Sequence, residues 1–345
     1  MLIPLVLLFG ILLFSTRFSR QTLFKSYNSV SQTQAIKGFF VITIFFSHFC
    51  SYVQLDAWYD DVMRKYCRYL GQLMVAPFFF YSGYGIFESV KKKGAAYIKT
   101  FPKRRILKTL LHFDFAVLLF FLLDFFMGES ISWSAFLLSL VAWESIGNSN
   151  WFVFAILCAY VFAYVGLWVF KGEMKRALLF ITMMSFLFIF FVRQFKAEYW
   201  VNTILALPLG CSLSLFKEKF EKIVHRHFVE LVGLVALLFG VAKCNIICSS
   251  FVNSQLILFS FSAAIVLISL HVQVNSKILS WFGTLVFEIY ILQRIPMNLL
   301  FYMQLNNQNI YLFFVISFVC TLALSILFKK WNVFFDSKIL CGLKG

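Results

Sequence analysis

The sequence predicts an all-α protein of the membrane: a polytopic helix bundle with about 10–11 transmembrane helices. Hydrophobic residues make up 61 % of the 345 residues and charged residues only 13 %, whereas soluble domains contain about 45–50 % and about 25 %. Phe alone occurs 47 times, and a chain of this size cannot hide so much apolar surface in one core. The apolar residues also gather in runs close to the roughly 20 residues that a spanning helix needs. This composition excludes a soluble enzyme, a disordered chain and a coiled-coil fibre.

Apolar runs separated by short polar stretches predict the elements in chain order. They are 1–15, 35–53, 70–88, 109–127, 133–147, 151–170, 177–192, 199–216, 229–242, 251–272, 278–297 and 310–328. The run 133–147 ends in a polar stretch, so we expect an amphipathic or re-entrant piece on the outer side there and spans elsewhere. The chain then divides into an extra N-terminal transmembrane helix (1–16), one membrane domain (30–330) and a cytoplasmic tail (331–345).

The basic residues predict the orientation of these spans. The net charge is +16, and the cytoplasmic loops of membrane proteins carry an excess of Lys and Arg. With the N-terminus outside and the C-terminus in the cytoplasm, 24 of the 31 basic residues fall in inner segments and 7 in outer ones. The positive charge is therefore explained by topology, and no nucleic-acid partner is expected.

The cysteines predict no metal site. There are eight, scattered mostly within apolar runs and without the spacing of metal ligands. Cys244 and Cys248 lie four residues apart near a predicted outer loop, where apolar packing is favoured over a disulfide or a metal site.

Lys37 and His48 are the first candidates for chemistry, because ionisable side chains inside a span are costly and usually functional. They lie eleven residues apart on the predicted second span, which is almost three helical turns, so they share one face about 16–17 Å apart. Lys37 at the cytoplasmic edge could grip an anion, and the deeper His48 could move a proton. Snorkelling of Lys37 and an interhelical hydrogen bond of His48 are the structural alternatives.

Glu288 is the second deep candidate. It lies at the middle of the run 278–297, where a carboxylate must find a partner or be protonated. His48 or a substrate hydroxyl could be that partner, and an ion pair with Arg294 is the structural alternative.

The segment 91–108 holds eight basic residues. Arg105 and Lys108 face the same way on a helix, and together with Arg104 they could hold phosphates. The structural alternative is that the whole segment is a topology signal. Ser82 and Gly83, at the end of the third span, permit a close backbone approach, and helix packing alone would explain them.

Together these residues resemble the acyltransferase-3 family of polytopic membrane proteins, which O-acylate sugars and other hydroxyl acceptors. The family's basic-x10-His signature matches residues 37–48, its FFxxSG motif matches 78–83, and its RxxR motif matches 105–108 with Lys108 for the second Arg. Its late SxxxYLxH-like segment is matched loosely: Tyr290 is kept, but Val286 replaces Ser and Gln293 replaces His. The stretch Asn150-Trp151-Phe152 at the start of a span resembles the family's WF motif. The resemblance covers about residues 30–330.

The resemblance implies a bacterial O-acyltransferase of the cytoplasmic (inner) membrane. Its donor would be cytoplasmic acyl-CoA, usually acetyl-CoA, with no permanently bound cofactor. Its acceptor would be a hydroxyl of a cell-surface glycan or a lipid-linked sugar. His48 would act as general base or acyl carrier, and Glu288 would orient it or share the acid–base work. The donor phosphates would meet Lys37, Arg104, Arg105 and Lys108. The substrate path would include Ser82, Gly83, Asn150, Trp151 and Tyr290.

Two other classes of protein fit the composition. A flippase for a lipid-linked oligosaccharide would need a polar cavity but no CoA site. A receptor or a structural membrane protein would not need Lys37 and His48 on the same face of one helix.

Overall fold

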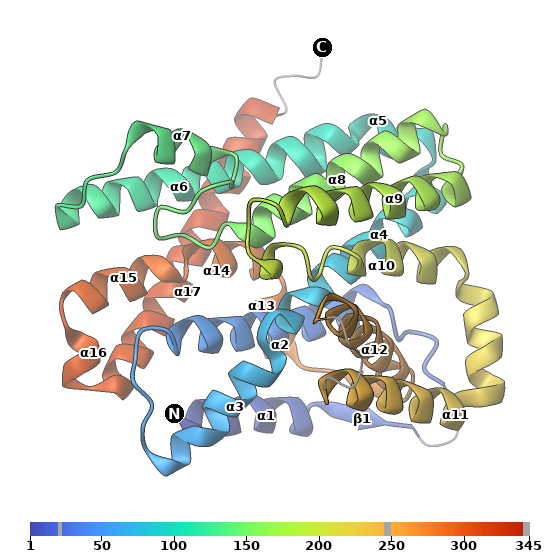
Figure 1. Ribbon diagram of the computed structural model, residues 1–345, viewed down its shortest axis with the longest axis horizontal. Coiled ribbons are helices and arrows are strands. Elements are labelled where there is room, and N and C mark those ends of the chain that lie inside the picture. The colour runs from blue at the N-terminus through green and yellow to red at the C-terminus, as the bar shows by residue number, and fades with distance from the viewer. Residues whose placement is uncertain (20–22, 245–249, 341–345) are drawn as a thin grey trace.

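The computed structural model describes residues 1–19, 23–244 and 250–340, and it is almost entirely helical. Most helices run side by side in one direction across the view of Figure 1. This confirms the predicted all-α membrane bundle. Arg20, Cys248 and the last five residues of the expected tail lie outside the described residues.

The helices of the first half are α1 (Leu2–Phe14), α2 (Val30–Phe49), α3 (Asp61–Leu70), α4 (Ala76–Lys93), α5 (Ala95–Phe101), α6 (Lys108–Met127), α7 (Trp133–Leu140), α8 (Trp151–Val169) and α9 (Met174–Val192). Those of the second half are α10 (Ala206–Leu215), α11 (Lys217–Lys243), α12 (Ser250–His271), α13 (Lys277–Gly283), α14 (Val286–Leu292), α15 (Arg294–Tyr302), α16 (Leu305–Gln308) and α17 (Ile310–Phe335). Short 3-10 turns lie at Trp58–Asp60, Gly71–Val75 and Glu198–Trp200, and π-helical turns at Pro102–Leu107 and Asp336–Leu340. β1 (Thr16–Phe18) pairs antiparallel with β2 (Val272–Val274).

Fewer helices than expected are long and apolar enough to cross a membrane by themselves. Within the described residues, six meet that test: Ala95–Met127, Trp151–Val169, Met174–Val192, Lys217–Lys243, Ser250–His271 and Ile310–Lys338. The bent pair Lys277–Gly283 and Val286–Tyr302 raises the number to as many as seven.

The other expected spans form α1, α2, α4 and α10. With 13 and 10 residues, α1 and α10 are short for a span. With 20 and 18 residues, α2 and α4 are long enough, but they carry more polar and charged residues. Most of their side chains are buried inside the bundle. Their interior position means that most of their side chains contact protein and not lipid.

Several expected loops are helical. The basic segment 91–108 runs from the end of α4 through α5 and a π-helical turn into α6. Residues 217–243, expected as a polar loop and a span, form the single helix α11, which is kinked at His227. Residues 331–335 of the expected tail continue α17. In the run 133–147 only the eight residues of α7 are helical, which agrees with a piece that does not span.

Contacts between loops gather the segments that we expect outside at one end of the bundle. The N-terminal amine forms an ion pair with Asp60. Nζ of Lys196 lies 2.8 Å from a carboxylate oxygen of Glu144. Lys243 donates to the carbonyl of Tyr69 at 3.0 Å.

The segments that we expect in the cytoplasm meet one another in the same way. β1 pairs with β2, Lys91 donates to the carbonyl of Ser214 at 2.5 Å, and Lys108 forms an ion pair with Asp336. In each of these contacts, both partners come from segments that the charge pattern places on the same side. Which end faces the cytoplasm stays a prediction.

Two close crossings hold the centre of the bundle together. Gly83 of α4 lies against the backbone of Leu207, and Gly210 of α10 lies against the backbone of Phe80. A Cβ atom at either glycine would overlap a carbonyl oxygen of the other helix. Gly38 of α2 and Gly283 at the end of α13 make a second crossing of the same kind. These contacts fix the positions of the helices that carry Lys37, His48 and Ser82.

A bend of 63° separates α13 from the α14–α15 stretch. It falls at residues 284–285, between Gly283 and Val286. Glu288 therefore lies in the first turn of a new helix. Broken helices are tolerated at membrane depth where they are buried in protein or line a cavity.

Candidate active site

The structure gathers all four predicted donor-binding residues around one cavity of about 400 Å³, the inner cavity. Its walls come from α2, α4, α6, α8, α14, α17 and the π-helical turn before α6. Among its lining residues are the predicted Lys37, Ser82, Arg104, Arg105, Lys108, Glu288 and Tyr290. Lys329 and Asp336 also line it, so five cationic side chains face two carboxylates.

The RxxR-like motif begins on the π-helical turn Pro102–Leu107 and ends at Lys108, the first residue of α6. Proline has no backbone N–H, so a regular helical bond is missing there, and π turns in helices often mark functional sites. The guanidinium of Arg105 lies close to Tyr97 and Tyr160. The hydroxyl groups of Tyr160 and Ser82 form a hydrogen bond at 3.2 Å. The serine of the FFxxSG motif is thus linked to the arginine of the RxxR-like motif through Tyr160.

Glu288 and Lys108 differ in their ionic partners. Nζ of Lys108 lies 2.5 Å from Oδ2 of Asp336. Within the described residues, Glu288 has no cation within 4.0 Å, although Lys329 and Lys108 line the same cavity. The alternative of an ion pair between Glu288 and Arg294 is therefore wrong for this structure.

His48 lines a second, smaller cavity of about 260 Å³, the outer cavity. Ser47, Gln72, Trp151 and Tyr199 line it as well. Nδ1 of His48 is buried and has no hydrogen-bond partner among the described residues. This imidazole is thus held at the wall of a small cavity with one nitrogen uncommitted.

Tyr290 separates the two cavities, because it lines both of them. Its side chain is buried, with 1 % of the residue exposed. Its ring centroid lies 6.2 Å from that of His48 and 5.0 Å from that of Phe152. Lys37 lies on one side of Tyr290 and His48 on the other. Glu288 lines only the inner cavity, so the structure does not bring it together with His48.

Gly83 and Asn150, both expected along the substrate path, line neither cavity. Gly83 makes the close crossing with α10, so the packing alternative describes its contacts. Asn150 is buried, and its amide donates to the carbonyl of Ala142 at 3.0 Å. Trp151, the next residue, does line the outer cavity.

Sequence reasoning missed two polar residues near these cavities and considered a third, Arg294, only as a partner of Glu288. Tyr160 lies in an unbroken apolar run, and Asp336 in a segment expected to be a tail. Arg294 lies close enough to His48 to act on it electrostatically, and its Nε is buried without a partner among the described residues. Arg294 follows Glu288 by six residues, so the two side chains lie on different faces of a helix. That Arg294 lies near His48 depends on how α2 packs against the α14–α15 stretch, which helix spacing does not show.

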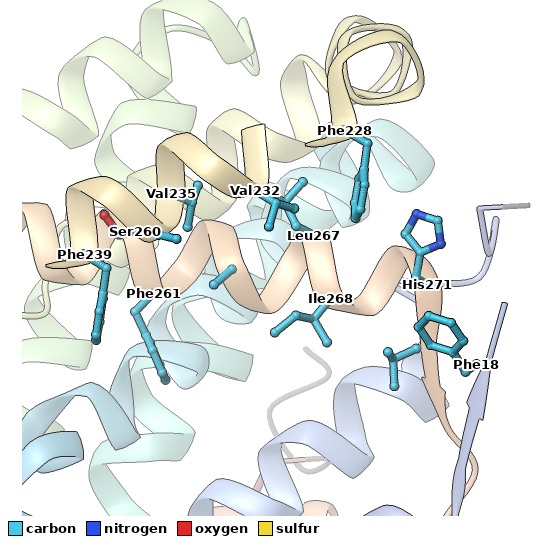
Figure 2. A pocket seen from close by; sticks show the side chains of 13 residues that line it. Phe18, Phe228, Val232, Val235, Phe239, Ser260, Phe261, Leu267, Ile268 and His271 are labelled. Carbon is cyan, nitrogen blue, oxygen red and sulfur yellow. The ribbon is translucent and has the colours of Figure 1, made fainter. Parts of the chain in front are cut away.

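A further cavity, of about 670 Å³, lies between α11 and α12 and is almost wholly apolar (Figure 2). Phe228, Val232, Val235 and Phe239 of α11 face Phe261, Leu267 and Ile268 of α12 across it (Figure 2). Its polar side chains are Ser260 and His271. Nδ1 of His271 donates to the carbonyl of Ser19 at 2.8 Å. This cavity lacks the charged groups of the inner cavity, so it is not the candidate site.

The comparisons with known proteins identify the family of the chain. A family model described as an acyltransferase domain, acyltransferase 3, matches residues 32–330. No curated protein and no solved structure matches the chain significantly. The match covers most of the chain, including both cavities except for the last residues of α17 and Asp336. The chain therefore belongs to the acyltransferase 3 family, and it is a multi-pass membrane enzyme that transfers acyl groups.

Proposed function

We propose that this enzyme transfers an acyl group, in the first place acetyl, from cytoplasmic acyl-CoA to a hydroxyl of a cell-surface glycan or lipid-linked sugar. The membrane is the bacterial cytoplasmic membrane, and the inner cavity opens to the cytoplasm. The observation that carries the proposal is the meeting of two cavities of different chemistry at Tyr290.

The inner cavity suits the donor. Coenzyme A carries several phosphate charges, and the five cations of this cavity offer them ammonium and guanidinium groups. Lys37 and His48 lie on the same face of α2 and about 16 Å apart along its axis. That separation is comparable with the reach of the pantetheine arm. A thioester could therefore come close to Tyr290 while the phosphates stay at Lys37, Arg105 and Lys108.

The outer cavity suits a sugar acceptor. Trp151 and Tyr199 provide aromatic surface, and Gln72 and Ser47 provide polar groups that can position hydroxyls. The ring centroids of Trp151 and Tyr199 are 5.9 Å apart, with the rings nearly perpendicular. The apolar face of a sugar ring could pack against such a surface while one hydroxyl points toward His48.

His48 would carry the proton. As general base it takes the proton of the acceptor hydroxyl, and the oxygen attacks the thioester carbonyl. The C–S bond then breaks, and the proton returns to the leaving sulfur of CoA. In the alternative order, an imidazole nitrogen of His48 attacks the thioester carbonyl, the C–S bond breaks, and the CoA sulfur leaves with the imidazole proton. The acceptor hydroxyl then attacks the acyl-imidazole, and its proton passes to the imidazole as the acyl–nitrogen bond breaks. Glu288 lies on the donor side of Tyr290, so any acid–base role for it would be exercised there.

A flippase is less well supported by this geometry. It would need a continuous polar path across the bundle, whereas the buried Tyr290 lies between the two cavities.

The proposal can be tested with the purified protein in lipid nanodiscs. We expect saturable binding of CoA and slow release of acetate from radiolabelled acetyl-CoA. In cells, we expect surface glycans to lose O-acetyl groups when the gene is deleted and to regain them on complementation. Absence of CoA binding would exclude the donor, and an unchanged O-acetyl content would exclude the acceptor class.

A further inference from the structure

Asp336, the first residue after α17, lies at the inner cavity and touches the helix that follows the RxxR-like motif. Its Oδ2 lies 2.5 Å from Nζ of Lys108, and its Oδ1 accepts a hydrogen bond from Nε2 of His112 at 3.1 Å. Only 17 % of its side chain is exposed. Both carboxylate oxygens are thus engaged by α6.

Lys108 differs in this respect from the other cations of the cavity. Within the described residues, Lys37, Arg104, Arg105 and Lys329 have no carboxylate oxygen within 4.0 Å, whereas Lys108 has Asp336. The carboxylate also comes from beyond the matched acyltransferase domain, which ends at residue 330. The position where a phosphate would meet Lys108 is therefore held by an anion of the chain itself.

A carboxylate and a phosphate compete for the same donors. Both are charged oxygen acceptors, and a phosphate ester carries more negative charge than a carboxylate. The Lys108 side chain is 42 % exposed although that of Asp336 is only 17 % exposed, and contact of the ammonium group with water weakens an ion pair. A phosphate that entered the mouth of the cavity could therefore replace Asp336 at Lys108.

We propose that Asp336 is an internal competitor of the donor. It holds Lys108 and His112 while no donor is bound, and a phosphate of acyl-CoA displaces it. Donor binding then releases the segment that follows α17 from Lys108 and His112. This inference rests on the proposed function, because it takes acyl-CoA as the ligand of the inner cavity. The opposing interpretation is that the ion pair only anchors α17.

The two interpretations predict opposite signs for the effect of Asp336→Asn on CoA binding. We expect the variant in nanodiscs to bind CoA about three- to tenfold more tightly by calorimetry, and to show a lower KM for acetyl-CoA. Asp336→Glu should stay near the wild-type affinity, because the charge is kept. Asp61→Asn is the matched control: it removes the same charge from an aspartate that pairs with Arg64 at the other end of the bundle, and it should leave CoA affinity unchanged.

A second variant separates specific competition from a general charge effect. In a Lys108→Met background, Asp336→Asn should produce less than half of its original fold-change. Unchanged or weaker CoA binding by Asp336→Asn would overturn the inference while leaving the proposed function in place. An equal gain with and without Lys108 would also overturn it. Absence of CoA binding to the wild-type protein would instead remove the proposed donor, and the inference with it.

A third measurement does not depend on the folding of Asp336 variants. A spin label at Ser337→Cys, in a background without other reactive thiols, should become more mobile when CoA is added to saturation. Pantetheine, which has no phosphate, should not produce this change. Unchanged mobility in the presence of bound CoA would contradict the displacement of Asp336.

Discussion

At the scale of single residues, the chemistry depends on where each polar side chain meets another. Ser82, Tyr160 and Arg105 come from three different helical segments and meet beside the inner cavity. None of the three would be recognised as a partner of the others from spacing along the chain. The arginine is thereby held by neutral hydroxyl and aromatic groups, which leaves its charge for a ligand.

His48→Gln should abolish acyl transfer while CoA binding persists. Glutamine keeps hydrogen bonding but cannot take a proton or carry the acyl group, and loss of a general base costs about 10²–10⁴ in rate. Thr43→Ser, on the same helix but lining neither cavity, is the control and should remain active. Transfer of acetyl to the glycan at the wild-type rate by the glutamine variant would mean that His48 has only a packing role.

Arg105→Ala should raise the KM for acetyl-CoA about ten- to a hundredfold, because a charge-assisted contact with a phosphate is worth roughly 1.5–3 kcal/mol. Lys103→Ala is the matched control, since Lys103 lies in the same π-helical turn but does not line the inner cavity. Steady-state kinetics on both variants measures the difference. Equal effects of the two substitutions would indicate that the basic segment acts through net charge alone.

At the scale of elements, two glycine-mediated crossings and one broken helix create the site. The crossings bring α2 against α13 and α4 against α10 at backbone contact. The bend after α13 then turns α14 so that Glu288 lines one cavity and Tyr290 lines both. The wall between the two cavities therefore depends on how tightly these helices pack.

Gly83→Ala and Gly210→Ala should each destabilise the protein by about 1–3 kcal/mol, because the added methyl group meets backbone that cannot move aside. Gly85→Ala is the control on the same helix. A Cβ at Gly85 has no atom within 4 Å, so its substitution should be neutral or stabilising by up to about 1 kcal/mol. Thermal unfolding in one detergent would compare the three variants. Equal melting temperatures would contradict the close crossing of α4 and α10.

At the scale of the whole molecule, the loops that the charge pattern divides into two groups keep to their own group. Each of the loop contacts described above joins two members of the same group. The charge pattern assigns the strongly basic group to the cytoplasm. In that orientation the inner cavity lies on the side where acyl-CoA is made.

Labelling of single cysteines on intact cells tests the orientation. In a background without other reactive thiols, Val62→Cys should react with an impermeant maleimide and Ala96→Cys should react only after lysis. Both positions are exposed in the structure. Ala96 is a better labelling position in this segment than Gly94, because Gly94 has a positive φ of 54° at which a cysteine side chain would be strained. The reverse labelling pattern would place the inner cavity outside the cell.

The sequence by itself determined the membrane class, the family resemblance and several of the residues that line the candidate site. Lys37 and His48 could be related because they lie on one helix, where spacing fixes the relative direction of side chains. The same holds for Arg105 and Lys108. These predictions needed only local geometry and the cost of placing charge in lipid.

Only the tertiary structure decided how the helices meet. It placed Glu288 on the other side of Tyr290 from His48, put Arg294 near His48, and brought Asp336 to Lys108 across 228 residues. It also gave α2 and α4 an interior position. The physical reason is that the apolar pattern of a helix shows that it leaves water. The pattern does not show which neighbouring helix it packs against. That choice depends on backbone contacts at Gly38, Gly83, Gly210 and Gly283, and on side chains that become partners only after the helices have packed.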